Sequence, residues 1–318
     1  MTRGPDPRGR AQFGAETDEG GHFVRQVSRF RDWVTADGSS GFRAEPGRYH
    51  LYVSRACPWA HRSIIVRRLK RLEDVITMSV VDPIRDERGW RFGVGRGFSP
   101  DPVNGFRYLA EAYHATDPDF AGRVTVPVLW DRETGRIVSN ESGDVIRMLN
   151  RAWDEWGDDA LDLEPDDLRE EIDAINERVY RDVNNGVYRA GFATAQEAYD
   201  EAFDALFARL DELDGLLLER RYLTGDRITL ADWRLFTTLI RFDSVYHGHF
   251  KCNLRRIVDY AALWPYLREL YGWPGVADTV DFDHIKRHYY VTHDSINPTG
   301  IVPKGPALDL TQPHDRDS

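Results

Sequence analysis

The chain has 318 residues with 41% hydrophobic content, enough for about two domains with substantial cores. Its net charge of −11 argues against general nucleic-acid binding, and no apolar run approaches the ~20 residues of a membrane-spanning helix. Cys57 and Cys252 are the only cysteines, so neither a disulfide framework nor a thiolate zinc site is expected. The first residues show no secretory pattern, so we expect a cytoplasmic protein. From the charge, the apolar runs and the cysteine count, we expect no nucleic-acid partner, no membrane association and no metal.

Residues 1–48 form an N-terminal extension to the first domain. Residues 1–21 are polar and rich in glycine and proline, which is typical of a mobile tail. Aromatic residues follow at Phe23, Phe30 and Trp33, and we expect this lead-in segment to dock on a core.

The first domain is predicted to span 49–155 as a thioredoxin-like α/β fold. Its elements are expected as a strand at 49–53, a helix through 63–69, strands at 75–81, 124–130 and 137–139, and a helix that opens at 140–142. The order β-α-β followed by β-β-α is that of a thioredoxin-like domain, with a parallel first pair. Residues 83–122 form an insertion dense in glycine, proline and aromatic residues, and loops this long are often functional.

Helical periodicity dominates the second domain, which is predicted to be all-α over 156–290. Apolar residues recur at helical spacing over 168–183 and 203–213, and shorter helices are expected at 254–260 and 264–270. Thr229 and Asp232 form a capping box that predicts a buried helix over 231–240. Residues 291–318 form a C-terminal tail, the end of which we expect to be loose.

Cys57 lies between an apolar strand and a helix, with Pro58 suited to the first helical position. The N-terminus of a helix favours a thiolate, so the pKa of Cys57 is expected below the ~8.5 of a free thiol. Ala60 stands where a dithiol motif has its second cysteine, so this site has one thiol. The basic neighbours Arg55, His61 and Arg62 favour a reactive thiol over an inert core cysteine.

Two further pairs complete a candidate site in this fold. If the Val126–Pro127 bond is cis, the Val126 backbone can pair with a peptide-like ligand; the simpler interpretation is the start of an edge strand. Glu141 and Ser142 open a helix and could hold an ammonium and a carboxylate, although they could equally be only a cap. Their order along the chain, with an all-α domain after them, favours function.

Long motifs then make a family recognisable over nearly the whole chain. They lie at residues 30–34, 57–62, 89–92, 126–127, 140–142, 185–193, 232–236, 288–290 and 297–300. The chain resembles the glutathione transferases with a catalytic cysteine. Within them it resembles the xi class, the glutathionyl-hydroquinone reductases.

The resemblance implies a role for each candidate residue. Cys57 would be the nucleophile, and Trp90 would lie against glutathione. Val126, held by Pro127, would pair with the cysteinyl backbone of glutathione, and Glu141 with Ser142 would bind its γ-glutamyl end. Two tyrosines of the helical domain would meet the hydroxyls of the aromatic substrate: Tyr188 and Tyr289, with Tyr290 as a competitor for the second role.

The predicted function is glutathione-dependent reduction of glutathionyl-hydroquinones through a Cys57–glutathione mixed disulfide. The co-substrate is expected to be glutathione, although another low-molecular-weight thiol could occupy its place. The family implies a homodimer. Two alternatives stay open: an omega-like thiol transferase or dehydroascorbate reductase, and a non-catalytic thiol-binding or redox-sensing module.

Overall fold

The computed structural model describes residues 16–316, which divide into two compact units. The first unit holds residues 26–161 and 281–292, and the second holds 16–25, 162–280 and 293–316. Residues 1–15 of the predicted mobile tail lie outside the described part of the chain. Every helix within 16–316 is too short or too polar to cross a membrane.

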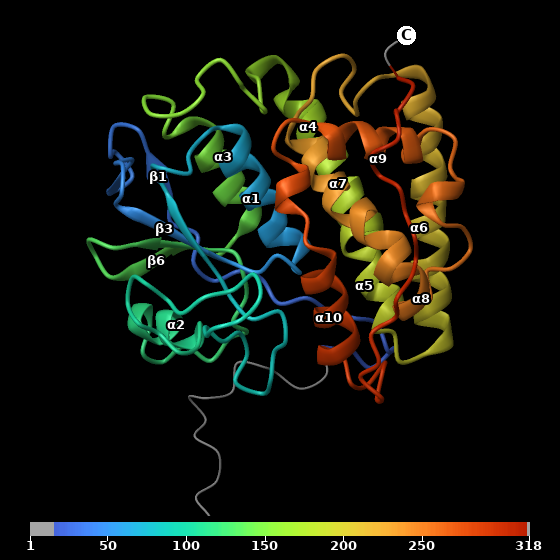
Figure 1. The fold of residues 1–318 in the computed structure, drawn as a ribbon, viewed down its shortest axis with the longest axis horizontal. Helices are drawn as coiled ribbons and strands as arrows, with labels where there is room; N and C mark the ends of the chain where they lie inside the picture. Colours follow the sequence, from blue (N-terminus) through green and yellow to red (C-terminus); the bar gives the residue numbers. More distant parts are fainter. Residues whose placement is uncertain (1–15, 317–318) are drawn as a thin grey trace, which may run out of the picture. The chain divides into compact units, whose positions relative to one another are not determined.

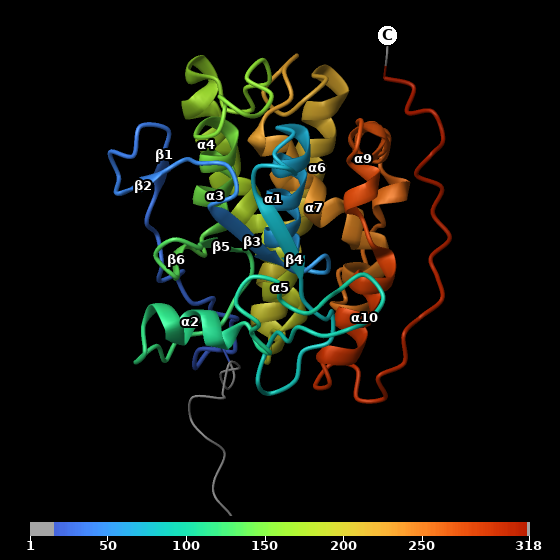
Figure 2. The same ribbon diagram turned by 60° about the vertical axis from the view of Figure 1, so that its left-hand side comes forward.

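The first unit is built on a four-stranded sheet in the order β4-β3-β5-β6; Figure 1 labels β3 and β6, and Figure 2 labels all four strands. β3 pairs in parallel with β4 and antiparallel with β5, and β5 pairs antiparallel with β6. This topology confirms the predicted thioredoxin-like fold. The elements of this unit are β1 (Val34–Thr35), β2 (Phe42–Arg43), β3 (Tyr49–Val53), α1 (Pro58–Leu69), β4 (Thr77–Val80), α2 (Ala110–Thr116), β5 (Val128–Asp131), β6 (Arg136–Ser139), α3 (Ser142–Arg151) and α10 (Phe282–Thr292).

Helices and a lead-in segment cover this sheet. α1 packs against α3, and α2 packs against β6 (Figure 2). The lead-in segment adds to the free edge of β6, since Asp32 N–H donates to Val138 O at 2.9 Å. The Phe30 ring packs on the rings of Tyr113 and Phe120, at 5.6 Å in both cases. Phe30 therefore docks on a core as expected, whereas Trp33 stays exposed.

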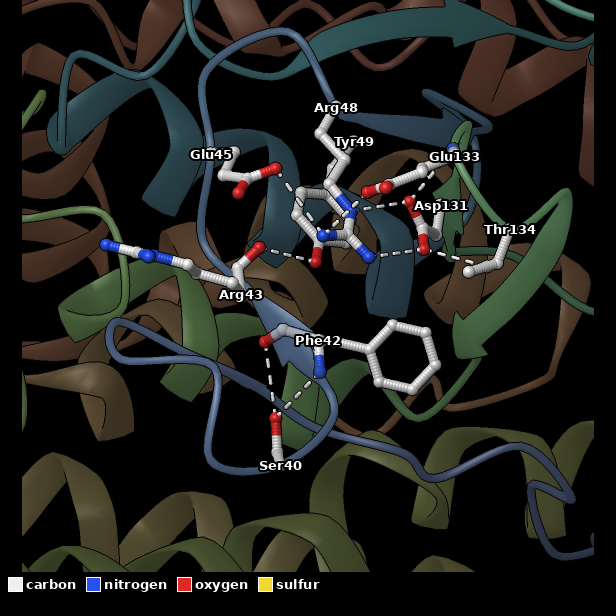
Figure 3. Close-up of polar contacts among 9 residues, drawn as sticks. All are labelled: Ser40, Phe42, Arg43, Glu45, Arg48, Tyr49, Asp131, Glu133 and Thr134. Atoms are coloured by element: carbon white, nitrogen blue, oxygen red, sulfur yellow. Dashed lines mark hydrogen bonds and ion pairs between the residues drawn. The ribbon is translucent and has the colours of Figure 1, made fainter.

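A buried ion pair fixes the start of β3 to the β5–β6 hairpin (Figure 3). The guanidinium of Arg48 donates to both oxygens of Asp131, from Nε at 2.8 Å and from Nη2 at 2.9 Å. Thr134 Oγ1 donates to the same carboxylate at 2.7 Å. Tyr49 OH donates to Arg43 O at 2.7 Å and ties β2 to this corner. This bidentate ion pair orients β3, and the chain continues from β3 to Cys57.

The second unit is all-α, as predicted. Its elements are η2 (Asp166–Leu168), α4 (Arg169–Val179), the π-helical turn η3 (Tyr180–Asn184), α5 (Gly186–Gly191), α6 (Gln196–Glu219), α7 (Leu230–Arg241), the π-helical turn η4 (Phe242–Tyr246), α8 (His247–His249), η5 (Ile257–Asp259), α9 (Leu263–Gly272) and η6 (Ala277–Thr279). α5 packs on α6, α4 packs on α7, and α9 contacts both α6 and α7.

The capping box confirms the predicted start of α7. The N–H of Thr229 donates to Asp232 Oδ2 at 2.8 Å. In contrast, the predicted helix over 254–260 is wrong, because only the single turn η5 forms there. The N–H groups of Ile257 and Val258 donate instead to the Asp243 carboxylate, at 2.6 and 3.2 Å.

α10 packs with the first unit, although its residues were assigned to the helical domain through residue 290. His284 Nε2 donates to Arg96 O at 2.7 Å, and His288 Nδ1 donates to Pro83 O at 2.7 Å. Both carbonyls belong to the 83–122 insertion. These hydrogen bonds join α10 to a segment about 200 residues earlier, and no local sequence pattern marks their acceptors. The sequence therefore did not indicate that α10 belongs to the first unit.

Candidate functional site

Cys57 occupies the N-cap position of α1, which begins at Pro58 as predicted. After β3 the chain turns sharply, and Cys57 N–H donates to Ser54 O at 3.2 Å. The thiol is half-buried and donates to the carbonyl of Val126 across 3.6 Å. Its side chain makes no capping bond to the first turn of α1. The sulfur therefore lies at the positive end of a 12-residue helix.

The Val126–Pro127 bond is cis, which meets the condition set by the sequence prediction. Val126 and Pro127 lead into β5, whose first residue, Val128, pairs with Tyr52 of β3. Because β5 runs antiparallel to β3, the first residue of β5 and the last residues of β3 lie at the same end of the sheet. The strand predicted over 124–130 begins only at Val128, since proline cannot donate to a ladder.

Glu141 is the N-cap of α3, as the simpler interpretation expected. Its Oε1 accepts from Gly143 N–H at 3.0 Å, and its Oε2 accepts from Ser28 Oγ at 2.9 Å. Burial alone would raise the pKa of Glu141, but the Gly143 N–H, the Arg62 charge and the Ser28 hydroxyl together hold it below its ordinary value. The carboxylate is therefore ionised at neutral pH and can pair with an ammonium.

Arg62 connects α1 to the start of α3. Its side chain is buried, and Nη2 and Nε donate to Ser142 Oγ at 2.6 and 3.2 Å. Nη2 also lies 3.8 Å from Glu141 Oε1. A hydroxyl oxygen that accepts from a guanidinium keeps its own hydrogen for donation, so Ser142 can donate to a carboxylate.

Sequence reasoning considered Arg62 only as a basic neighbour of Cys57. The structure directs its guanidinium to Ser142, because α1 and α3 pack together. No amphipathic pattern marks this contact in the sequence, because ten of the twelve residues of α1 are buried and the helix has no distinct polar face.

Trp90 lies in the 83–122 insertion and is 4% exposed. Its ring stacks on His288 at 5.0 Å between centroids, and the guanidinium of Arg85 lies 4.9 Å from the ring centre. Its carbonyl accepts from Leu109 N–H at 2.9 Å. The 83–122 insertion and α10 thus hold this indole in place, and sequence reasoning missed both His288 and Arg85.

The tyrosines lie in different units. Tyr289 is on α10 in the first unit, fully buried and edge-on to His288 at 5.2 Å, while Tyr290 is half-buried. Tyr188 is on α5 in the second unit, half-buried among aromatic rings, with Phe250 at 5.3 Å. The structure thus joins Cys57 to Val126, the Glu141 carboxylate to Arg62, and Tyr289 to Trp90 through His288.

The two halves of the chain match two successive domains of one family. Residues 56–152 match the glutathione S-transferase N-terminal domain, and residues 196–269 match the glutathione S-transferase C-terminal domain. A thioredoxin-like unit with a cysteine at the N-terminus of its first helix, followed by an all-α unit, is therefore a glutathione transferase architecture.

Similar proteins narrow the family further. The chain is 52% identical to glutathionyl-hydroquinone reductase YqjG of Escherichia coli, over 94% of this chain and 93% of that protein. It is 54% identical to glutathionyl-hydroquinone reductase PcpF of Sphingobium chlorophenolicum, over 92% of each. The glutathione-bound structure of YqjG covers 91% of this chain and 96% of its own, with a TM-score of 0.89. A xi-class transferase from Natrialba magadii, 53% identical, has a TM-score of 0.90 and covers 92% and 90%.

The chain therefore belongs to the glutathione transferase superfamily and, within it, to the xi-class glutathionyl-hydroquinone reductases, which are glutathione-dependent oxidoreductases.

Proposed function

We propose that this enzyme reduces glutathionyl-hydroquinones to hydroquinones through a Cys57–glutathione mixed disulfide. The observation that carries the proposal is a single thiol at the N-terminus of α1, 3.6 Å from the Val126 carbonyl, with Ala60 in place of a second cysteine. The substrate class is proposed from the names of the two curated relatives.

In the first step, the Cys57 thiolate attacks the glutathionyl sulfur of the substrate. The carbon–sulfur bond breaks, and the aryl carbon leaves with the electron pair and takes up a proton to give the hydroquinone. Tyr188 and Tyr289 would assist by hydrogen bonding to the hydroxyls of the departing ring. The enzyme is left with glutathione bound to Cys57 as a disulfide.

In the second step, a thiolate from solution attacks the glutathione sulfur of the mixed disulfide. Glutathione disulfide leaves, and Cys57 is restored as a thiolate. Cys252 does not serve as this second thiol: it is fully buried, and burial raises its pKa, so it stays protonated and unreactive. Cys252→Ser should therefore keep wild-type turnover.

The proposed glutathione site lies at the end of the sheet where β3 leads into Cys57. The Val126 backbone would pair with the cysteinyl part, and Trp90 would bound the site on the side of the 83–122 insertion. Glu141 would take the γ-glutamyl ammonium, and the Ser142 hydroxyl would donate to its carboxylate. These roles require a γ-glutamyl thiol, so glutathione should be a better substrate than cysteine or 2-mercaptoethanol.

Parallel turnover assays test the proposal. Glutathionyl-1,4-hydroquinone is compared with the mixed disulfide of glutathione and cysteine and with dehydroascorbate, each with excess glutathione. Faster turnover of the quinol conjugate supports the proposal. Preference for the disulfide or dehydroascorbate indicates an omega-like enzyme, and no turnover of any of the three indicates a binding module.

A further inference from the structure

The segment 16–25 is folded, although most of it was expected to be part of a mobile tail. It forms a tight hairpin in which Val24 N–H donates to Glu16 O at 2.8 Å and Gly21 N–H donates to Asp18 O at 3.1 Å. Gly21 has φ +80°, and a Cβ there would lie 2.8 Å from Ala195. Only glycine fits this close approach without strain.

This hairpin is bound to the helical unit near the start of α6. Thr194 N–H donates to Gly21 O at 3.0 Å, and His22 Nε2 lies 3.3 Å from a Glu201 carboxylate oxygen. Phe23 is buried, with its ring 5.5 Å from that of Phe192. The hairpin therefore presents its last residue, Arg25, to α5.

Arg25 contacts the ring of Tyr188. Its guanidinium carbon lies 4.9 Å from the Tyr188 ring centre, within the ~6 Å at which a cation attracts an aromatic face. Its Nε donates to Asn185 Oδ1 at 3.0 Å. Asn185 directly precedes α5, the helix that carries Tyr188, so the guanidinium is fastened to the same helix whose ring it covers.

The Tyr188 ring also packs among aromatic side chains. They are Phe23, Phe192, Tyr246 and Phe250, with centroid distances from 5.3 to 6.3 Å. Aromatic packing allows small rotations and slips of a ring, whereas a planar guanidinium with a fixed hydrogen bond constrains its orientation. Arg25 therefore supplies a directional contact to this ring.

We propose that Arg25 is a positioning residue for Tyr188 in the reduction of glutathionyl-hydroquinones, so that the hairpin 16–25 is part of the catalytic apparatus. This inference rests on the proposed function, because it requires Tyr188 to meet the aromatic substrate. It goes further by assigning a role to a segment that precedes both family domains. A misplaced hydroxyl lowers the rate even when the fold is intact.

Steady-state kinetics of Arg25→Ala, Tyr188→Phe and the double variant test this proposal. With glutathionyl-1,4-hydroquinone, R25A should lower kcat/KM by about three- to tenfold, the range of a partly buried cation–π contact. Turnover of the glutathione–cysteine mixed disulfide, which has no hydroxylated ring, should be unchanged. In the Y188F background, R25A should have no further effect, because the hydroxyl it positions is absent.

Arg25→Lys keeps a cation but loses the planar guanidinium and the Nε–H bond to Asn185, so it should recover only part of the quinol activity. Arg178→Ala is the matched control: it removes an exposed arginine ion-paired to Glu212 in the same unit and should leave both activities unchanged. If R25A does not fold, Arg25→Gln replaces it in the comparison with R25K. Melting curves establish which variants fold.

Four outcomes overturn the inference. One is an equal loss on both substrates, which indicates a general structural role. The second is a multiplicative effect of R25A and Y188F, and the third is a slow Y188F with fully active R25A; both leave the proposed function intact. The fourth is full activity of Y188F, which overturns the proposed role of Tyr188 as well.

Discussion

Glu141→Gln is the substitution whose effect follows most directly from the site. The Glu141 carboxylate has about four acceptor positions. Gly143 N–H and Ser28 Oγ occupy one position on each oxygen, and Arg62 lies at 3.8 Å, so room remains for a ligand ammonium. The side chain is 30% exposed, which screens part of a charge-assisted bond of about 1.5–3 kcal/mol. We expect a loss of about 1.4 kcal/mol, or about tenfold in affinity for glutathione.

The assay measures the KM for glutathione and the kcat, with glutathionyl-1,4-hydroquinone in excess. Gln keeps an oxygen for the Gly143 N–H, so the cap of α3 and the kcat should be nearly retained. The matched control is Asp144→Asn, which removes a negative charge from the same turn, where the carboxylate binds Arg31. D144N should leave the KM within about twofold. An unchanged KM in E141Q, or an equal rise in D144N, refutes this reasoning.

Three further substitutions test buried polar contacts within the two units. Ser142→Ala leaves the buried Arg62 without the acceptor of two hydrogen bonds, so urea unfolding should show a loss of about 2 kcal/mol, and the KM for glutathione should rise; unchanged stability would contradict the contact. Asp131→Asn removes the negative charge from the bidentate ion pair with Arg48, and the free energy of unfolding should fall by about 2–4 kcal/mol at pH 7. Burial alone would raise the pKa of Asp131, but Arg48 and Thr134 lower it overall, so its stabilisation is present above the unfolded pKa of ~3.9 and is lost as the pH falls through the lowered folded value. D131N should therefore lose part of the acid sensitivity of the wild type in unfolding curves, and an identical pH profile would count against this assignment. Asp232→Ala leaves the Leu223 and Thr229 N–H groups and the Tyr266 hydroxyl without their buried acceptor. The free energy of unfolding, followed by circular dichroism, should fall by about 3–5 kcal/mol, and a fall below about 1 kcal/mol would show that these bonds contribute little.

Local signals predicted the elements that frame the site. Pro58 marked the start of α1 behind Cys57, and the Thr229–Asp232 pair marked the start of α7. Each depends on residues within one turn of the chain, where side chains satisfy the first backbone donors of a helix. The helix predicted over 254–260 does not form for the complementary reason, since the acceptor of the Ile257 and Val258 N–H groups is Asp243, several turns earlier in the chain.

Contacts between distant segments were beyond the reach of such patterns. Arg62 meets Ser142 only because α1 and α3 pack together, and Trp90 is buried by His288, nearly 200 residues away in sequence. The hairpin 16–25 has the composition of a mobile tail, yet it folds because Phe23 finds an aromatic cluster on the helical unit. The composition of a segment indicates how much apolar surface it can bury by itself. Packing against residues elsewhere in the chain can order a segment whose own composition would not.

Intact-mass spectrometry of the protein with glutathionyl-1,4-hydroquinone alone tests the central claim most directly. Reduced enzyme is mixed with one equivalent of the conjugate, without free thiol, and then peptide-mapped. We expect one glutathione on Cys57, stoichiometric release of hydroquinone, and complete removal of the adduct when glutathione is added. Cys57→Ser should show neither adduct nor release. Turnover that requires both substrates together, with no glutathione on Cys57, would contradict the account.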